Sequence, residues 1–309
     1  MLFDLHLDLE VYLNETLRGF LGEKYKPLRQ LSLERHFDFQ QGKKTHLKFA
    51  ICQIQSLTVS GRRIKPIQSI DMFLRNLTTF KRRLARYADV KTVATARDLR
   101  NVQRINIILG CEGLYFLKHP DEVEALWARG VRVFGLCWNL TNRVTGTILE
   151  HGKGLTEFGR QVVEKIVAHD GIVDLAHASN ATRKELIRRY PNNVMLSHNN
   201  ISRIHPFSQN LDDEILDLVR RHRVLVGLSF LPKALGQNSF AGWKRHYDFL
   251  RQYSPASVAL GTDFFGFAFR ESAVDAKNYL DLKRNFRRYD VDEHLMYNNC
   301  TRFFRLKDW

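Results

Sequence analysis

Residues 171–198 read GIVDLAHASNATRKELIRRYPNNVMLSH, and this stretch holds two short apolar runs on either side of a helical pattern. The first run, 171–176, has the isoleucine and valine content of a buried strand, and Ser179 is a residue type that caps helices. Pro191 cannot continue a helix, so the helix must end before it, and the second run follows at 193–197. A strand, a helix and a second strand in this order predict a parallel βαβ unit.

The same alternation continues along the rest of the chain. We expect eight strands, near residues 2–8, 46–54, 105–111, 131–137, 171–176, 193–197, 223–230 and 257–262. Helical patterns lie between them, at 67–87, from 120 onward, and at 155–168, 179–190, 212–222 and 292–305. The pattern predicts one (β/α)₈ barrel of the TIM type over residues 1–309, an ordinary length for that fold. The poorly periodic segment 14–45 is expected to be an insertion over the barrel mouth.

Side chains that can bind metal ions stand where several of the apolar runs stop. They are His6, Asp8, Glu112, His177, His198 and Asp263. In a barrel, the carboxyl ends of all strands meet on one face, and that face carries the active site. Each of these residues alone is more commonly a buried, hydrogen-bonded side chain. Their joint placement favours a pair of divalent cations and hence a metal-dependent hydrolase.

The spacing within two of these motifs supports the same interpretation. His6 and Asp8 are two residues apart on one expected strand, so both side chains face the same side and can reach one ion. Glu112 is flanked by Gly110 and Gly113, which let the backbone turn sharply beneath the carboxylate. A glutamate in that position can bridge two ions, and single histidines on neighbouring strands would complete the second one.

Composition is that of a globular protein, with 44% hydrophobic and 26% charged residues. The four cysteines form no CxxC pair, so neither a zinc knuckle nor a disulfide framework is indicated. The net charge of +15 is concentrated at 43–104 and 283–288, where Phe and Leu interleave with the charges at helical spacing. That pattern describes solvated helix faces, and we do not expect nucleic acid as a partner.

The beginning of the chain shows no signal peptide, because the His6 motif follows Met1 almost at once. No uninterrupted apolar stretch approaches the roughly 18–20 residues of a membrane span. A cytoplasmic protein without a membrane span is therefore expected.

Several motifs resemble those of one known family, the membrane (renal) dipeptidases, peptidase family M19. The opening DLHLDL at 4–9 resembles that family's DGHNDL, and Glu112-Gly113 resembles its EG step. Within 154–182, GLTEFGRQVV and VDLAHASNAT are similar to GLTxFGRxVV and VDLSHxSDAT. Further similarities follow in the family's order, in SHNN at 197–200, GTDFFG at 261–266 and NCTRFF at 299–304. The resemblance covers essentially the whole chain and is that of a divergent, bacterial-type member.

This resemblance implies a zinc-dependent hydrolase of dipeptides or related small amides. The implied ligands are His6 and Asp8 for one zinc, His177 and His198 for the other, and Glu112 between them. A metal-bridged hydroxide would attack the scissile carbonyl. Asp263 would take the proton of the water and pass it to the leaving amine.

Three positions depart from the family pattern. Trp138 stands where mammalian relatives have a substrate-binding histidine, and its indole or the neighbouring Asn139 amide can donate a hydrogen bond instead. Gln209 stands where an arginine usually grips the substrate carboxylate, and Arg203 is a nearby substitute. Phe265 replaces the second aspartate of GSDFDG. We therefore expect a complete metal site beside an altered substrate pocket.

Two other functions stay open at this point. A metal-dependent phosphoesterase or nuclease on a related barrel would suit the charge of +15, but such enzymes typically open with HxH rather than HxD. A catalytically weak or inactive family member would keep its metal ions and serve as a binding scaffold. A homodimer is left open in all three cases.

Overall fold

The computed structural model describes residues 1–22, 24, 26–29, 33–60, 63–93, 95, 97–98, 103–150 and 152–305. Its strands are β1 (Leu2–Leu7), β2 (Leu47–Gln55), β3 (Leu57–Ser60), β4 (Arg63–Pro66), β5 (Val90–Val93), β6 (Ile105–Glu112), β7 (Val131–Gly135), β8 (Ile172–Asp174), β9 (Val194–Leu196), β10 (Leu225–Leu228) and β11 (Val258–Leu260). Its helices are α1 (Leu9–Leu13), α2 (Glu15–Phe20), α3 (Phe39–Lys44), α4 (Ile70–Leu84), α5 (Glu122–Ala128), α6 (Glu157–Ala168), α7 (Asn180–Arg189), α8 (Asp213–His222), η2 (Pro232–Ala234), α9 (Phe240–Tyr253), η3 (Phe269–Glu271), α10 (Tyr279–Arg288) and α11 (Glu293–Arg305).

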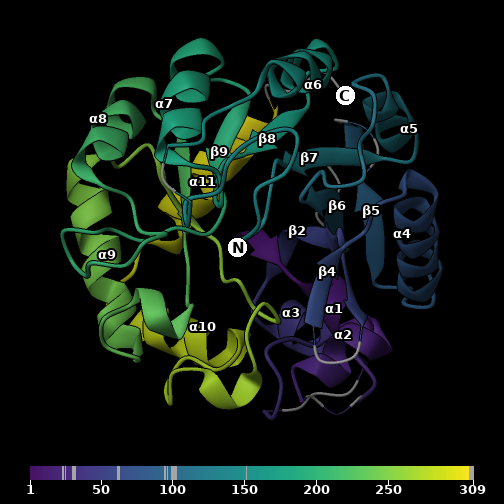
Figure 1. The fold of residues 1–309 in the computed structure, drawn as a ribbon. Coiled ribbons are helices and arrows are strands. Elements are labelled where there is room, and N and C mark those ends of the chain that lie inside the picture. Colours follow the sequence, from purple (N-terminus) through teal and green to yellow (C-terminus); the bar gives the residue numbers. More distant parts are fainter. Residues whose placement is uncertain are drawn as a thin grey trace.

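Eight parallel strands close into a barrel. The order is β1, β2, β6, β7, β8, β9, β10 and β11, and β11 pairs back with β1. Helices α4 to α10 surround these strands (Figure 1). The predicted (β/α)₈ fold is thus confirmed. All eight expected strands are present, with bounds shifted by a few residues.

One end of the barrel is filled by apolar side chains. Phe3 from β1 stacks on Phe49 from β2 and on Phe304 from α11, at ring-centroid distances of 5.0 and 4.8 Å. Tyr297 and Cys300, also from α11, belong to the same buried cluster. Helix α11 therefore covers the amino ends of the strands, and functional side chains have room at the opposite, carboxyl ends.

The structure also contains elements that the sequence patterns did not predict. Strand β5 pairs with β6 outside the eight-stranded ring, and β3 and β4 form a separate antiparallel hairpin. Helices α9 and α10 were not expected, and the segment 14–45 contains α2 and α3. Among the described helices, none has the length and apolar character that a membrane crossing requires.

Candidate metal centre

Six side chains converge at the carboxyl ends of five barrel strands. They form three overlapping groups whose ligand atoms lie within 4.8 Å of one another, namely His6 with Asp8 and Glu112, Glu112 with His177 and His198, and His6 with His198 and Asp263. Every member is at least nine-tenths buried. All six residues were predicted from the sequence, and the structure brings them together.

Glu112 lies at the centre of this cluster. Its Oε1 is 3.1 Å from His177 Nε2, 3.7 Å from His6 Nε2 and 3.9 Å from His198 Nε2. The backbone turns directly after it at Gly113, whose φ of +88° lies in the left-handed region that favours glycine. One carboxylate therefore faces histidines from three different strand ends, which is the geometry a bridging ligand needs.

A serine hydroxyl orients two of the histidines. Ser197 Oγ donates to Asp174 Oδ2 at 2.5 Å and lies 3.0 Å from His6 Nδ1 and 2.8 Å from His198 Nδ1. A hydroxyl has one proton and can accept two hydrogen bonds, so here it must accept from both Nδ1 atoms. Both rings then carry a proton on Nδ1, which leaves the Nε2 lone pairs free for a metal ion.

The third histidine is oriented in a similar way. His177 Nδ1 lies 3.0 Å from Asn139 Oδ1, and Gln209 Nε2 donates to the same oxygen at 3.0 Å. Gln209 Nε2 is also 3.4 Å from His177 Nδ1. Asn139 and Gln209, both predicted to bind substrate, thus lie beside the cluster and support His177.

Gln55, at the end of β2, connects two of the carboxylates. Its Nε2 donates to Asp8 Oδ1 at 2.9 Å and also to Glu112 Oε2. The register explains this contact, because Gln55 pairs with Glu112 across the β2–β6 ladder. Gln55 was not predicted from the sequence, although it follows an expected apolar run as the predicted ligands do.

Asp263 is held in an unusual backbone conformation. Its φ is +60°, and its Oδ1 lies 4.0 Å from His6 Nε2. At Gly266, an added Cβ would stand 2.2 Å from Asp263 Oδ1 and 2.6 Å from Asp8 Oδ2. Only glycine therefore allows these two carboxylates to lie so close to the turn that follows β11.

The charges in the cluster favour a bound cation. Burial lowers the pKa of His6, but attraction to Asp8 and Glu112 outweighs it and raises that pKa to about 10. Burial raises the pKa of Asp263 well above its usual range, and repulsion from nearby carboxylates adds to this. Burial also lowers the pKa of His198 well below its usual value, with the neighbouring histidines contributing. The carboxylates thus require positive charge at their centre.

The donor set fits divalent metal ions. His6 Nε2 is buried and has no hydrogen-bond partner among the described residues, a costly state for a polar atom unless an ion binds it. His177 Nε2 and His198 Nε2 lie only 2.8 Å apart, each with its other nitrogen already engaged. Buried imidazole and carboxylate ligands of this kind suit zinc and similar ions.

The two remaining predicted residues occupy different places. Trp138 is half-buried, and its ring centroid lies 6.3 Å from that of His177. Arg203 is on the surface, where its Nε donates to Asp213 Oδ1 at 2.5 Å. The structure therefore brings Trp138 to the edge of the cluster and leaves Arg203 away from it.

A cavity of about 250 Å³ opens beside the cluster. Asp8, Gln55 and Gly266 line it on the cluster side. Its other walls are apolar and consist of Val11, Leu17, Leu21, Leu57, Ile64, Trp138 and Phe265. This cavity connects the candidate metal centre with α1, α2 and the β3–β4 hairpin.

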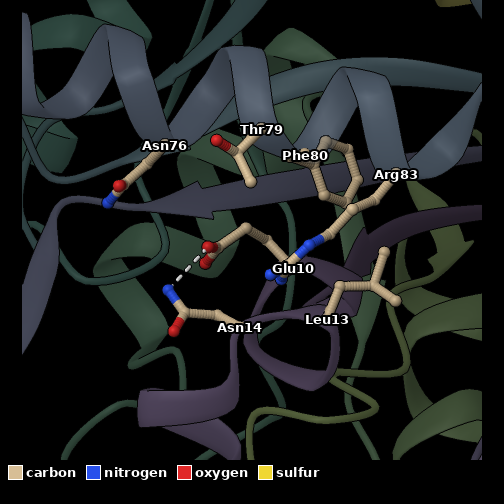
Figure 2. Close-up of a pocket in the computed structure, with 7 residues that line it drawn as sticks. All are labelled: Glu10, Leu13, Asn14, Asn76, Thr79, Phe80 and Arg83. Carbon is tan, nitrogen blue, oxygen red and sulfur yellow. Dashed lines mark hydrogen bonds between the residues drawn. The ribbon is translucent and has the colours of Figure 1, made fainter.

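A second cavity, of about 180 Å³, lies between α1 and α4 (Figure 2). Glu10 and Asn14 line it from α1 and the residue that follows it, and Asn14 Nδ2 donates to Glu10 Oε1 at 3.0 Å. Asn76, Thr79 and Arg83 from α4 also line it. It contains one carboxylate and no histidine among its described lining residues, so it does not repeat the ligand set of the metal cluster.

The chain is similar in sequence to curated dipeptidases. Dipeptidase 3 of Macaca fascicularis is 24% identical over 279 residues, which cover 86% of this chain and 54% of that protein. The chain therefore spans about half the length of this curated relative.

Two solved structures share the fold over the full chain. A dipeptidase AC of peptidase family M19 has a TM-score of 0.81 at 20% identity, covering 100% of this chain and 98% of its own. A metallopeptidase from Rhodobacter sphaeroides, liganded with a phosphinate mimic of the dipeptide L-Ala-D-Ala, has a TM-score of 0.80 at 20% identity, with coverage of 100% and 99%.

The family model for membrane dipeptidase matches residues 1–307. That match includes every strand of the barrel and every residue of the metal cluster. The chain thus belongs to the membrane dipeptidase family, peptidase family M19.

Proposed function

We propose that this protein is a zinc-dependent hydrolase of dipeptides or related small amides. The observation that carries this proposal is the position of Glu112 Oε1, within 4 Å of the Nε2 atoms of three histidines. Asp8 completes a set of five buried candidate ligands, and Asp263 lies buried beside them. His6 and Asp8 would hold one ion, His177 and His198 the other, and Glu112 would lie between them.

When bound, such ions polarise a scissile carbonyl and lower the pKa of water enough to supply a nucleophile at neutral pH. The chain's own residues would supply the proton transfers. Asp263 Oδ1 lies 4.0 Å from His6 Nε2, at the edge of the proposed ion pair, so it could take the proton of the attacking water and return it to the leaving amine.

Supporting residues would keep the three imidazoles aimed at Glu112. Ser197 fixes the tautomers of His6 and His198, and Asn139 fixes that of His177. Because these hydrogen bonds already hold the rings in place, the rings would need little reorganisation when an ion binds.

The substrate end of the site differs from the family pattern. Gln209 takes the place of the carboxylate-binding arginine, and Arg203 is paired with Asp213 at the surface. A neutral amide holds a carboxylate less tightly than a guanidinium does. We therefore expect weak activity on plain dipeptides, and relatively better activity on substrates whose carboxylate is amidated or absent.

A panel of plain and amidated dipeptides would test this function. Each would be incubated with the zinc-loaded protein and with protein treated with a chelator, and amino-acid release would be measured. We expect amino-acid release only with the zinc-loaded protein. We expect no hydrolysis of bis-p-nitrophenyl phosphate, a phosphodiester probe. If no dipeptide or amidated dipeptide is cleaved at any zinc concentration, the hydrolase assignment is wrong.

A further inference from the structure

The polar cavity between α1 and α4 contains none of the six residues of the metal cluster. Glu10 and Asn14 line it from one side, and Asn76, Thr79 and Arg83 line it from α4. Figure 2 shows the carboxylate of Glu10 directed into the space between these side chains. Polar groups from two parts of the chain thus surround a space that the proposed hydrolysis does not use.

Glu10 is a buried carboxylate with one unsatisfied oxygen. Its side chain is at least nine-tenths buried, and Asn14 Nδ2 donates to its Oε1 at 3.0 Å. Its Oε2 is also buried and has no hydrogen-bond partner among the described residues. A carboxylate oxygen in this state is costly unless a donor or a cation reaches it. Asn14 is itself fixed, because its Oδ1 accepts from the backbone N–H groups of Thr16 and Leu17, so the acceptor is held in place.

Arg83 brings the opposite charge to the same cavity. Its side chain is half-buried and attracts the carboxylate of Glu10. In the described part of the chain, however, no hydrogen bond or ion pair joins the two groups. A guanidinium and a carboxylate that meet directly commonly form a bidentate pair. Because these two do not meet, the cavity presents one negative and one positive group to a third molecule.

The size of the cavity and its two charges indicate what it holds. Its volume of about 180 Å³ has room for about six water molecules, at the roughly 30 Å³ that each occupies in the liquid. Alanine has the same number of non-hydrogen atoms. A simple cation or anion would leave either Arg83 or Glu10 without a partner, whereas a zwitterion satisfies both. The side chains of Asn76 and Thr79 would supply further hydrogen bonds.

We propose that this cavity binds a small free amino acid such as glycine or alanine. The ammonium group of the ligand would donate to Glu10 Oε2, and its carboxylate would accept from the guanidinium of Arg83. Helix α1 begins directly after Asp8, so the bound molecule would contact the helix that follows a candidate metal ligand. Free amino acids are also what dipeptide hydrolysis would release, but binding at this site does not depend on that reaction.

Isothermal titration of the zinc-loaded protein would test whether both charges of the ligand are needed. The probes are L-alanine, alaninamide, which lacks the carboxylate, and N-acetylalanine, which lacks the ammonium group. L-alanine should bind most tightly, and each of the other two should bind at least about tenfold more weakly, the scale for losing a hydrogen bond to a charged group. If L-alanine does not bind, or binds no more tightly than either derivative, the proposal is wrong.

Variants would assign the binding to this cavity rather than to the metal centre. Arg83→Gln and Glu10→Gln should each weaken the binding of L-alanine by about tenfold or more. Arg75→Gln is the matched control, because Arg75 is exposed on the same helix and does not line the cavity. It should bind L-alanine like the wild type. If Arg83→Gln also binds L-alanine like the wild type, the ligand binds elsewhere and the proposal is overturned.

A crystal structure of the zinc-loaded wild type grown with L-alanine gives a test that needs no variant, so it holds even if Glu10→Gln does not fold. We expect the amino acid between Glu10 and Arg83, with its ammonium group at Glu10 Oε2. Water alone in the cavity would overturn the proposal, as would alanine in the crystal without measurable binding in solution. None of these readouts depends on turnover, so a failure to cleave dipeptides would leave the proposal standing.

Discussion

The metal cluster and the cavity beside it are built on different parts of the fold. The six side chains of the cluster stand in or just after the barrel strands, and each is at least nine-tenths buried. The cavity walls come mainly from α1, α2 and the β3–β4 hairpin, and Ile64 and Trp138 there are only half-buried. The barrel strands fix the positions of the cluster, whereas helices and a hairpin form the cavity walls around the mouth of the barrel.

This difference teaches where change is tolerated. A candidate ligand in or just after a barrel strand is positioned by the sheet, so its replacement should disturb the proposed ions and every step that would depend on them. A half-buried side chain on a short hairpin can change without moving the sheet. We therefore expect substitutions in the cluster to affect metal binding and turnover, and substitutions in the cavity to affect substrate choice.

The largest effect should follow from Glu112→Gln. The amide keeps the size of the side chain but removes the negative charge that three Nε2 atoms face. Losing a residue that only supports a metal ligand costs about 10–100-fold in metal affinity. Losing Glu112 itself should lower the metal affinity by more than this, and activity should fall with it. Metal titration of the variant would check this. If the variant binds metal as tightly as the wild type, Glu112 does not bridge the ions.

Asp263→Asn should separate proton transfer from metal binding. We expect the zinc content to stay nearly unchanged while kcat falls by about 10²–10⁴-fold, the scale for losing a general acid–base group. Elemental analysis and kinetics of the same preparation would give both values. A loss of zinc in this variant would instead make Asp263 a metal ligand, and its proposed role in proton transfer would have to be dropped.

Ser197→Ala tests the hydrogen bonds behind the cluster. Without the hydroxyl, the Nδ1 atoms of His6 and His198 lose their shared acceptor, and the tautomers are no longer fixed. Metal affinity should fall by about 10–100-fold, while saturating zinc should restore most of the activity. Ser202→Ala, at a half-buried serine in the loop that follows β9, is the control and should bind zinc like the wild type. Equal affinities in both variants would argue against the role of Ser197.

Gln209→Arg should produce the smallest effect, and it tests how the site binds the carboxylate of the substrate. A hydrogen bond to a charged group contributes about 1.5–3 kcal/mol, so kcat/KM for plain dipeptides should rise roughly tenfold or more relative to amidated ones. Arg203→Ala should change neither, because Arg203 is exposed and paired with Asp213. If Arg203→Ala abolishes cleavage of plain dipeptides, the expectation of weak activity on substrates with a free carboxylate is wrong.

Much of the barrel and the cluster could be predicted because both depend on local patterns. Continuous apolar runs mark the eight strands, and polar residues at their ends mark the side chains that converge in the cluster. The role of Ser197 could not be predicted, because its partner His6 is 191 positions away in the sequence. Only the closed order of the strands brings the two together.

The missed elements have physical causes of their own. Helix α9 contains Gly242 and several aromatic residues, which are weak helix formers. It forms because Trp243, Tyr247 and Leu250 become buried along one face, a tertiary effect. The β3–β4 hairpin is short and partly polar, so its strands gave no clear apolar run, and the cavity wall it contributes was not foreseen.

The most direct test of the central claim is the metal content of the purified protein. After growth in zinc-supplemented medium, elemental analysis should find up to two zinc ions per chain, and His198→Ala should retain about one. This result would show that buried ligands from four strand ends form one metal centre. If neither protein carries a divalent metal ion, the six residues do not form the proposed site.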